Sequence, residues 1–216
     1  MFLKSRDLNG KTRAGQKAVS RRSLVDAAIG LSARHGFAGL SLREVCREAG
    51  LAPTAFYRHF RDMDDLGLAL VDEVALSLRR LMREARRMAE RQESRVEASA
   101  VAFIDFIRRN ANLFRILMGE RLGSSPAFRK SLRREMNLFV NELAEDLQRA
   151  AQQARRPLAD PMLAAEAIVA VVFTVGAEAL DLPSRECKKL TERLIKEIRL
   201  ILIGSESLAR ARSGGA

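Results

Sequence analysis

Apolar residues recur at intervals of three and four positions along most of the chain. In the segment 20–35, four apolar side chains beginning with Leu24 fall on one face of a helix, at positions i, i+3, i+4 and i+7. A longer stripe with the same spacing runs from Leu66 to Met88 and predicts an extended amphipathic helix. No segment shows the apolar–polar alternation of a half-buried strand. The pattern therefore predicts an all-α protein.

Glycine and proline residues divide the rest of the pattern. The breaks fall at Gly123, Pro157, Pro161 and Pro183. The helices predicted between them cover 95–109, 111–120, 125–153, 160–180 and 184–205.

Two short helices with a glycine turn between them follow the first helix. Ser41 opens a capping box, Ser-Leu-Arg-Glu, and Gly50 ends the helix that begins there. Pro53 lies in the first turn of the next helix, where Phe56 and Phe60 are expected to face inward. A supporting helix followed by this pair is the helix-turn-helix arrangement, whose last helix enters the DNA major groove.

Positive charge is concentrated at the N-terminal end of the chain. The formal net charge of the 216 residues is +11, and residues 1–61 hold twelve basic and four acidic side chains. A basic end on a nearly balanced body indicates contact with a polyanion. The alternative is a solvated surface that only keeps the chain soluble.

Several functional classes lack support in the sequence. Cys46 and Cys187 form no CxxC pair, which favours a reducing cytoplasm, and the first 20 residues have no signal-peptide pattern. The longest apolar stretch, Ala167–Ala177, is shorter than the roughly 20 residues that span a bilayer, so we expect a buried helix and no membrane insertion. His35 and His59 lack ligand spacing and no nucleophile–base pair stands out, so we expect no metal, cofactor or catalytic site.

Six short segments carry a more specific signal: Leu24-Val-Asp-Ala-Ala28, Gly36-Phe37, Ser41-Leu-Arg-Glu-Val45, Ala49-Gly50-Leu51, Thr54-Ala-Phe-Tyr-Arg-His-Phe60 and Asp65-Leu66. Together they resemble the DNA-binding domain of the TetR family of transcriptional repressors. The resemblance implies a homodimer that represses transcription by binding palindromic operator DNA, with two recognition helices on successive turns of the duplex.

The resemblance also implies particular DNA contacts. Arg43 matches a position that reaches a base edge, where arginine can pair with guanine, and Thr54 and Ala55 match the groove-facing start of the recognition helix. Tyr57 and His59 match phosphate contacts. The full set of expected DNA-binding residues is Arg21, Arg22, Ser41, Arg43, Thr54, Ala55, Tyr57, Arg58, His59 and Arg61.

Simpler roles remain open for three of these residues. Tyr57 can be half-buried packing, His59 can bridge helices, and Arg43 can pair with a neighbouring carboxylate. Ala52 departs from the family pattern, because it replaces the small polar residue usual before the recognition helix, so a capping hydrogen bond is expected to be lost.

A closer resemblance extends over residues 13–200. Segments such as Arg21-Arg-Ser-Leu-Val25, Phe114-Arg-Ile-Leu117 and Gly176-Ala-Glu-Ala-Leu-Asp181 are similar to FabR/DesT-type repressors of unsaturated fatty acid synthesis. This resemblance implies that the effector is a long-chain acyl thioester, either acyl-CoA or acyl-ACP (the acyl carrier protein form). It also implies control of genes for fatty acid synthesis or desaturation.

Bulky apolar residues in the C-terminal part can line a pocket for an acyl chain. They are Phe103, Phe106, Ile107, Phe114, Leu117, Met118, Phe128, Phe139, Leu143 and Phe173. Arg121, Arg129 and Arg133 are expected near the head group, because guanidinium groups bind phosphate. The alternatives are an ordinary helical core with a basic rim, or a pocket for a different hydrophobic small molecule.

Apolar stripes on the last two predicted helices are expected to form a four-helix dimer interface. The residues assigned to it are Ile168, Val172, Val175, Leu190, Leu194 and Ile198.

The predicted organisation is a flexible basic arm (1–19), a helix-turn-helix domain (20–64), a helical ligand-binding and dimerisation domain (65–205) and a frayed tail (206–216). A lipid-binding module at a membrane surface and a small enzyme are the competing classes. The first lacks a large apolar surface helix and the second lacks a catalytic constellation.

Overall fold

The computed structural model describes residues 13–88, 92–121, 123 and 125–214, and every regular element in these ranges is an α-helix. The predicted all-α class is confirmed. The helices are α1 (Arg13–His35), α2 (Leu42–Glu48), α3 (Pro53–Phe56), α4 (Met63–Met88), α5 (Gln92–Arg109), α6 (Ala111–Glu120), α7 (Pro126–Ala154), α8 (Pro161–Ala179) and α9 (Ser184–Gly214).

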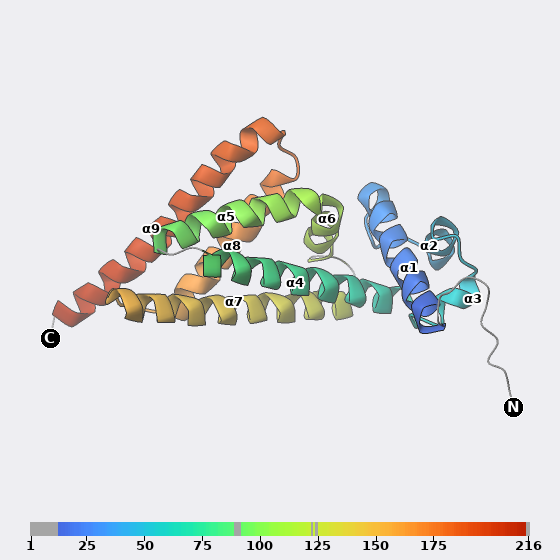
Figure 1. The fold of residues 1–216 in the computed structure, drawn as a ribbon, viewed down its shortest axis with the longest axis horizontal. Helices are drawn as coiled ribbons and strands as arrows, with labels where there is room; N and C mark the ends of the chain where they lie inside the picture. The colour runs from blue at the N-terminus through green and yellow to red at the C-terminus, as the bar shows by residue number, and fades with distance from the viewer. Residues whose placement is uncertain (1–12, 89–91, 122, 124, 215–216) are drawn as a thin grey trace, which may run out of the picture.

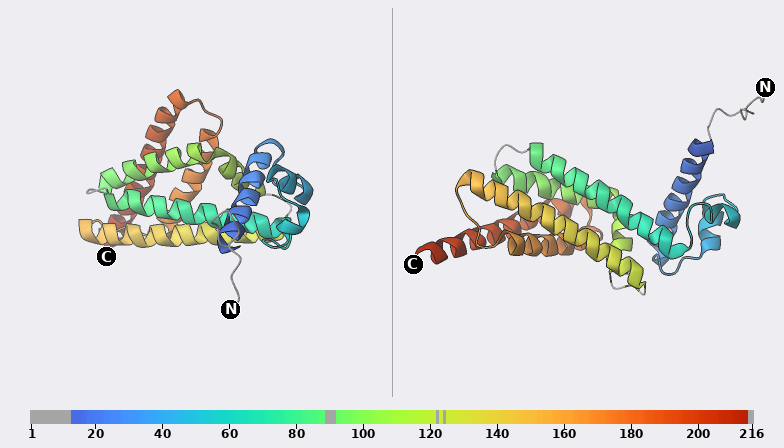
Figure 2. Two further views of the ribbon diagram at one scale, coloured as in Figure 1. Left: turned by 45° about the vertical axis from the view of Figure 1, so that its right-hand side comes forward. Right: turned by 90° about the horizontal axis from the view of Figure 1, so that it is seen from below.

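The helices form two units along one elongated molecule (Figure 1). The short helices α2 and α3 lie with α1 at one end, and α4 leaves this unit to run lengthwise beside α7 (Figure 2). Helices α5, α8 and α9 complete a bundle with α4 and α7. The C-terminus of α9 lies at the end of the molecule opposite to α1, α2 and α3.

Two clusters of buried apolar side chains hold these units together. The first includes Leu24 and Phe56 of the N-terminal unit and continues into the bundle through Phe128 of α7. The second lies within the bundle, with members from α4 to α9, and includes Phe103 and Leu194. Burying each such large side chain contributes about 1.5–3 kcal/mol, so packing of the helix faces is the main stabilising term.

Short polar side chains set where the long helices begin. The hydroxyl of Ser125 accepts a hydrogen bond from the Phe128 amide at the start of α7 (3.2 Å), and the carboxylate of Asp160 accepts one from the Leu163 amide at the start of α8 (3.0 Å). In both helices a proline follows the cap residue, at a position where no intrahelical amide bond is lost. These local signals explain why the predicted boundaries of α7 and α8 agree with the structure to within a few residues.

The ends of the chain differ from the prediction. Helix α1 begins at Arg13 rather than near Ser20, because the intervening residues have good helix propensity and need no apolar period to continue the helix. Residues 1–12 of the expected arm lie outside the described residues. Helix α9 runs to Gly214 rather than fraying after 205. Its buried Glu206 forms an ion pair with Arg156 (2.6 Å), which anchors the last turns against the segment between α7 and α8.

Helix α8 is long and apolar enough to cross a membrane by length and composition alone. Nine of its residues are buried within the protein, and Val169 and Phe173 are among them. The core helices of soluble proteins can pass the same test of length and composition. The structure therefore supports the predicted role of this stretch as a buried helix.

A glycine permits close packing where the N-terminal unit meets the bundle. A Cβ atom on Gly67 of α4 would lie 2.8 Å from the Phe37 ring and 2.9 Å from the Phe128 ring. These two rings pack with their centroids 5.8 Å apart, one from each unit. The absence of a side chain at Gly67 lets α4 approach both aromatic rings.

Candidate functional site

Ser41 and Glu44 form the capping box that the sequence predicts. The Ser41 hydroxyl oxygen accepts from the Glu44 amide (3.3 Å), and the Ser41 amide donates to the Glu44 carboxylate (3.0 Å). The hydroxyl also donates to that carboxylate (2.7 Å). Both polar groups of Ser41 are thus used to begin α2, so a phosphate contact by this residue has to compete with the cap.

The recognition helix is shorter than predicted. Regular α-helix extends only over Pro53–Phe56, and hydrogen-bonded turns carry the chain on to Phe60, whose amide donates to the Phe56 carbonyl (3.0 Å). Phe56 and Phe60 are both buried, as predicted for the inward anchors. Ala52 provides no side-chain cap, which agrees with the expected loss of that hydrogen bond and leaves the first turn less firmly held.

The opposite side of this segment is exposed. Thr54, Tyr57 and Arg58 face solvent, and Ala55 is half-buried. The Tyr57 side chain is 64% exposed, so it is not the half-buried packing residue of the simpler alternative. Arg43, in the first turn of α2, is also exposed, and none of the carboxylates in the described ranges pairs with it. These side chains are free to meet DNA.

His59 lies between this surface and the packed interior. Its Nδ1 atom is buried, and no hydrogen-bond partner for it occurs among the described residues. Burial lowers the pKa of His59 below 6.5, and the nearby cations Lys17, Arg21 and Arg58 lower it further. The imidazole is therefore neutral at physiological pH and lies within a basic surface.

Three further arginines differ in their surroundings. Arg21 is exposed, with its guanidinium 5.0 Å from the centre of the Phe60 ring. Arg61 is exposed and 3.7 Å from the carboxylate of Asp65. Arg22 pairs with Glu73 of α4 and also with Asp26 of its own helix.

The pairing of Arg22 has electrostatic and structural consequences. A hydrogen bond to Asp26 and the charge of Glu73 raise the pKa of Arg22. The guanidinium predicted to contact DNA also joins α1 to α4. This role was invisible in the sequence, because the two residues are 51 positions apart.

A cavity of about 580 Å³ opens among α4, α5, α7, α8 and α9. Its volume falls within the range of small-molecule binding sites, roughly 300–1,000 Å³. Apolar side chains line its interior: Val96, Phe103, Phe139, Leu143, Ile168, Val172, Leu194 and Ile198. Charged and polar side chains also line it: Arg83, Arg95, Ser99, Asp146, Arg149 and Gln153.

Only three of the ten predicted pocket residues, Phe103, Phe139 and Leu143, line this cavity. Phe114 and Phe173 stack on each other and pack against Phe103, with ring centroids 5.8–6.3 Å apart, so they support the cavity wall. The other five belong to the surrounding cores: Phe106, Ile107, Leu117, Met118 and Phe128. The prediction selected bulky residues, whereas the face that each helix turns inward decides which of them reach the cavity.

The predicted head-group arginines do not line the cavity either. Arg129 donates to the Gly123 carbonyl, Arg121 is exposed just after α6, and Arg133 is exposed in the first part of α7. The arginines of the cavity are Arg83, Arg95 and Arg149, which come from the other ends of the bundle helices.

The residues predicted at the dimer interface are in the wrong place for that role. All six are buried within the single chain, and Ile168, Val172, Leu194 and Ile198 line the cavity. The large apolar side chains that α8 and α9 expose are instead Met162, Leu163, Leu200, Ile203 and Leu208. The dimer interface was predicted from the apolar composition of α8 and α9. Both helices use their inner faces for the core of the single chain, so a second subunit can contact only their outer faces.

Comparison with known proteins agrees with this architecture. The family model of bacterial regulatory proteins of the tetR family matches residues 24–70, and that of the tetracyclin repressor-like C-terminal domain matches residues 92–201. A transcriptional regulator from Pseudomonas aeruginosa PAO1 is similar in structure, with a TM-score of 0.71 and 22% identity over 94% of this chain and 96% of that one.

Two other solved structures share the fold. A TetR-family transcriptional regulator from Syntrophomonas wolfei has a TM-score of 0.76 and 14% identity, over 87% of this chain and 97% of that one. The fatty acid degradation regulator FadR from Bacillus halodurans has a TM-score of 0.70 and 19% identity, over 85% of this chain and 94% of that one.

A helix-turn-helix joined to a helical bundle defines a DNA-binding transcriptional regulator. This chain belongs to the TetR family of such regulators, whose two domain models together match most of its length. Membership implies operator DNA as a partner and assembly into dimers, and it gives no support to the enzyme alternative.

Proposed function

We propose that this protein is a homodimeric repressor that responds to a long-chain acyl thioester and controls genes of fatty acid synthesis, in particular unsaturated fatty acid synthesis or desaturation. The observation that carries the proposal is the cavity of about 580 Å³, with an apolar interior and charged side chains at one part of its lining. A TetR-type repressor that binds a different hydrophobic small molecule in this cavity is the alternative.

The DNA-binding half of the proposal is supported by the exposed face of the helix-turn-helix. Arg43, Thr54, Tyr57 and Arg58 are all solvent-accessible on a unit with a basic surface. In a two-fold dimer, two copies of this face meet successive turns of a palindromic operator.

The acyl half is supported by the shape and chemistry of the cavity. Phe103, Phe139 and Leu143 offer an acyl chain an apolar surface, and guanidinium groups lie within the same site. Regulators concerned with fatty acids also occur on this fold, since the Bacillus halodurans protein is described as a fatty acid degradation regulator.

Ligand binding can change operator affinity only if the two conformations of the protein bind the ligand differently. A tenfold preference supplies about 1.4 kcal/mol of coupling free energy. A saturated chain is straight and a cis double bond bends it, so a close-packed pocket must move its walls to accept both. Helix α4 forms one wall of the cavity and continues directly into the DNA-binding unit, so it connects the cavity to that unit mechanically.

The test begins with selection of an operator from random duplex DNA. Operator affinity is then measured with palmitoyl-CoA and oleoyl-CoA at equal concentrations below their micellar range. We expect at least one of them to change the affinity, and the two to differ. If both acyl-CoA esters leave operator affinity unchanged, the acyl-sensing proposal fails and only the assignment to the TetR family of regulators remains.

A further inference from the structure

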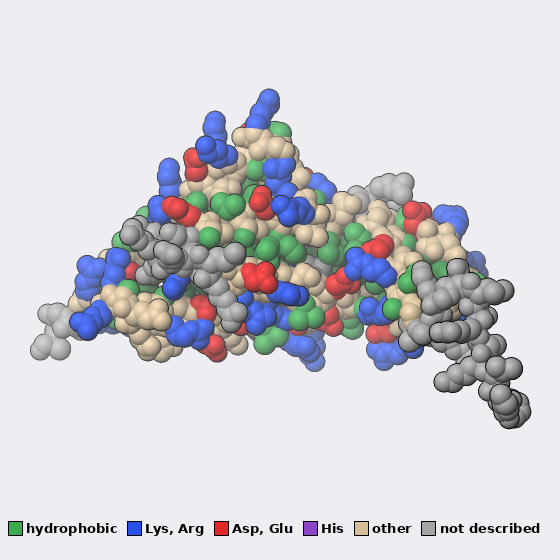
Figure 3. Space-filling view, in the orientation of Figure 1, with side chains coloured by type: hydrophobic (Ala, Val, Ile, Leu, Met, Phe, Trp, Pro, Cys, Tyr) green, Lys and Arg blue, Asp and Glu red, His purple; other side chains and the backbone are tan. Residues whose placement is uncertain are grey.

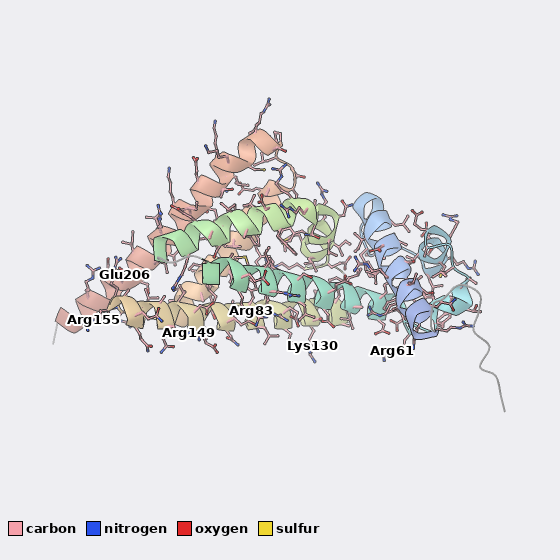
Figure 4. All side chains as sticks on the ribbon, viewed as in Figure 1. Arg61, Arg83, Lys130, Arg149, Arg155 and Glu206 are labelled. Carbon is pink, nitrogen blue, oxygen red and sulfur yellow. The ribbon has the colours of Figure 1, made fainter. Side chains whose placement is uncertain are left out.

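The polar residues of the cavity gather at one end of the bundle. Arg83 lies near the end of α4, Arg95 near the start of α5 and Arg149 near the end of α7. These helix ends lie together on the side of the molecule away from α1, α2 and α3 (Figure 1). Figure 4 shows Arg83 and Arg149 in this half, far from Arg61 of the DNA-binding unit.

The bulkiest apolar residues of the lining lie closer to the DNA-binding unit. Phe103 is in the second half of α5, and Phe139 is near the middle of α7. Phe103 packs edge-on against Phe114 of α6, which closes this end of the cavity. The site therefore changes along its length from a charged mouth to an apolar interior.

The mouth has an excess of positive charge. Among the residues that the structure describes, three guanidinium groups and one carboxylate, that of Asp146, line the cavity. Arg149 pairs with Asp146 and lies 3.7 Å from Glu145, and Arg83 lies 4.0 Å from Glu142. Both arginine side chains are more than half exposed, so these pairs are weak and the guanidinium groups can turn to a ligand at small cost. Basic side chains also stand out at this end of the bundle in Figure 3.

We propose that Arg83, Arg95 and Arg149 bind the anionic head group of an amphiphilic ligand whose apolar tail extends from this mouth toward Phe103. The head group is a phosphate or carboxylate, because both match the donor geometry of arginine. This inference rests on the proposed function for the existence of an apolar ligand. It adds the charge of that ligand, its orientation and the residues that select it.

The test compares three probes by isothermal titration calorimetry: palmitoyl-CoA, palmitate and the neutral palmitoyl thioester of N-acetylcysteamine. The variant is the double substitution Arg83→Gln with Arg149→Gln. The matched control is Arg121→Gln with Arg133→Gln, which removes the same charge from exposed sites outside the cavity. Circular dichroism melting curves confirm that each variant is folded.

We expect the cavity variant to bind palmitoyl-CoA about tenfold more weakly than the wild type, from the loss of charge-assisted hydrogen bonds. It should bind the neutral thioester unchanged, and the control variant should bind all probes like the wild type. A loss confined to palmitoyl-CoA identifies the phosphates as the bound anion, and a similar loss for palmitate identifies a carboxylate.

The inference is overturned if the neutral thioester binds the wild type as tightly as palmitoyl-CoA, or if both double variants lose affinity equally. If palmitoyl-CoA binds through these arginines but leaves operator affinity unchanged, the proposed function fails and the head-group site stands. If none of the three probes binds the wild type, both the proposed function and the head-group site are wrong.

Discussion

The carboxylate of Glu120 in α6 accepts a hydrogen bond from the backbone amide of Ala38, in the connection between α1 and α2 (3.1 Å). Glu120 is buried, with 6% of its surface exposed, and no cation among the described residues pairs with it. Its other oxygen lies so close to Gly123 that a Cβ atom there would be 2.1 Å away. A single charged side chain of the bundle thus holds the loop that leads into the helix-turn-helix.

Glu120→Ala is expected to loosen this junction. The Ala38 amide loses its carboxylate acceptor in a part-buried bond and can turn to water, so the cost is about 0.5–1.5 kcal/mol, and the orientation of α2 becomes less defined. Hydrogen exchange of the segment 36–40 should accelerate, and operator affinity should fall. Glu84→Ala, which removes an exposed carboxylate on α4, is the control and should change neither. Unchanged exchange in Glu120→Ala contradicts the role of this bond.

Gly67→Ala is expected to destabilise the protein. The added methyl group meets the rings of Phe37 and Phe128 at 2.8–3.0 Å, and overpacking of this kind costs about 1–3 kcal/mol. Gly30→Ala is the matched control, because a Cβ atom there meets nothing within 4 Å. Since alanine favours a helix interior, the control should stabilise the protein by up to about 1 kcal/mol. Equal melting temperatures for the two variants would falsify this account.

Arg43→Ala is expected to relax sequence preference at one operator position. Loss of a base contact costs about 1–3 kcal/mol per half-site. Tyr57→Phe should instead weaken binding to operator and random duplexes alike, because phosphate contacts position the protein without specifying sequence. Fluorescence anisotropy with both kinds of DNA makes the distinction. If Arg43→Ala loses equal affinity for operator and random DNA, Arg43 contacts the DNA backbone rather than a base.

His59 is expected to make stability and operator binding depend on pH in opposite directions. Its pKa in the folded protein is below 6.5, so as the pH falls below 6.5 the unfolded chain takes up the proton first and the free energy of unfolding decreases. A DNA phosphate next to His59 favours the imidazolium form, so operator binding takes up a proton and tightens as the pH falls toward and below 6.5.

The measurement for His59 is operator affinity across this pH range, compared with His59→Asn. The variant should lose the part of the pH dependence that the wild type owes to proton uptake. The same slope in both proteins means that His59 lies away from the phosphates.

Leu200→Glu is expected to produce a folded monomer. Leu200 of α9 is 70% exposed in the single chain, and Ile203 beside it is 55% exposed, so the substitution leaves the core intact. Sedimentation should show loss of the dimer, and operator affinity should fall with it, since one subunit contacts only half a site. Leu76→Glu, an equally drastic change at an exposed site on α4, is the control. A variant that remains dimeric excludes this face as the interface.

The sequence by itself determined the local features of this protein. The Ser41–Glu44 capping box and the inward anchors Phe56 and Phe60 follow from spacing within a few residues, and the structure contains all of them. The same holds for the number and order of the helices, because helical periodicity and breaker residues act over one or two turns. The family resemblance likewise depends on contiguous segments and was confirmed by the matching family models.

Tertiary structure alone decided which face of each helix meets which neighbour. Helix α8 has apolar side chains on both sides, so composition cannot tell that Val172 lines a cavity while Leu163 faces outward. Arginines occur at both ends of α7, and only the packing of α4, α5 and α7 puts Arg149 rather than Arg133 at the cavity. The physical reason is that burial depends on contacts between residues far apart in sequence, which periodicity within one helix does not encode.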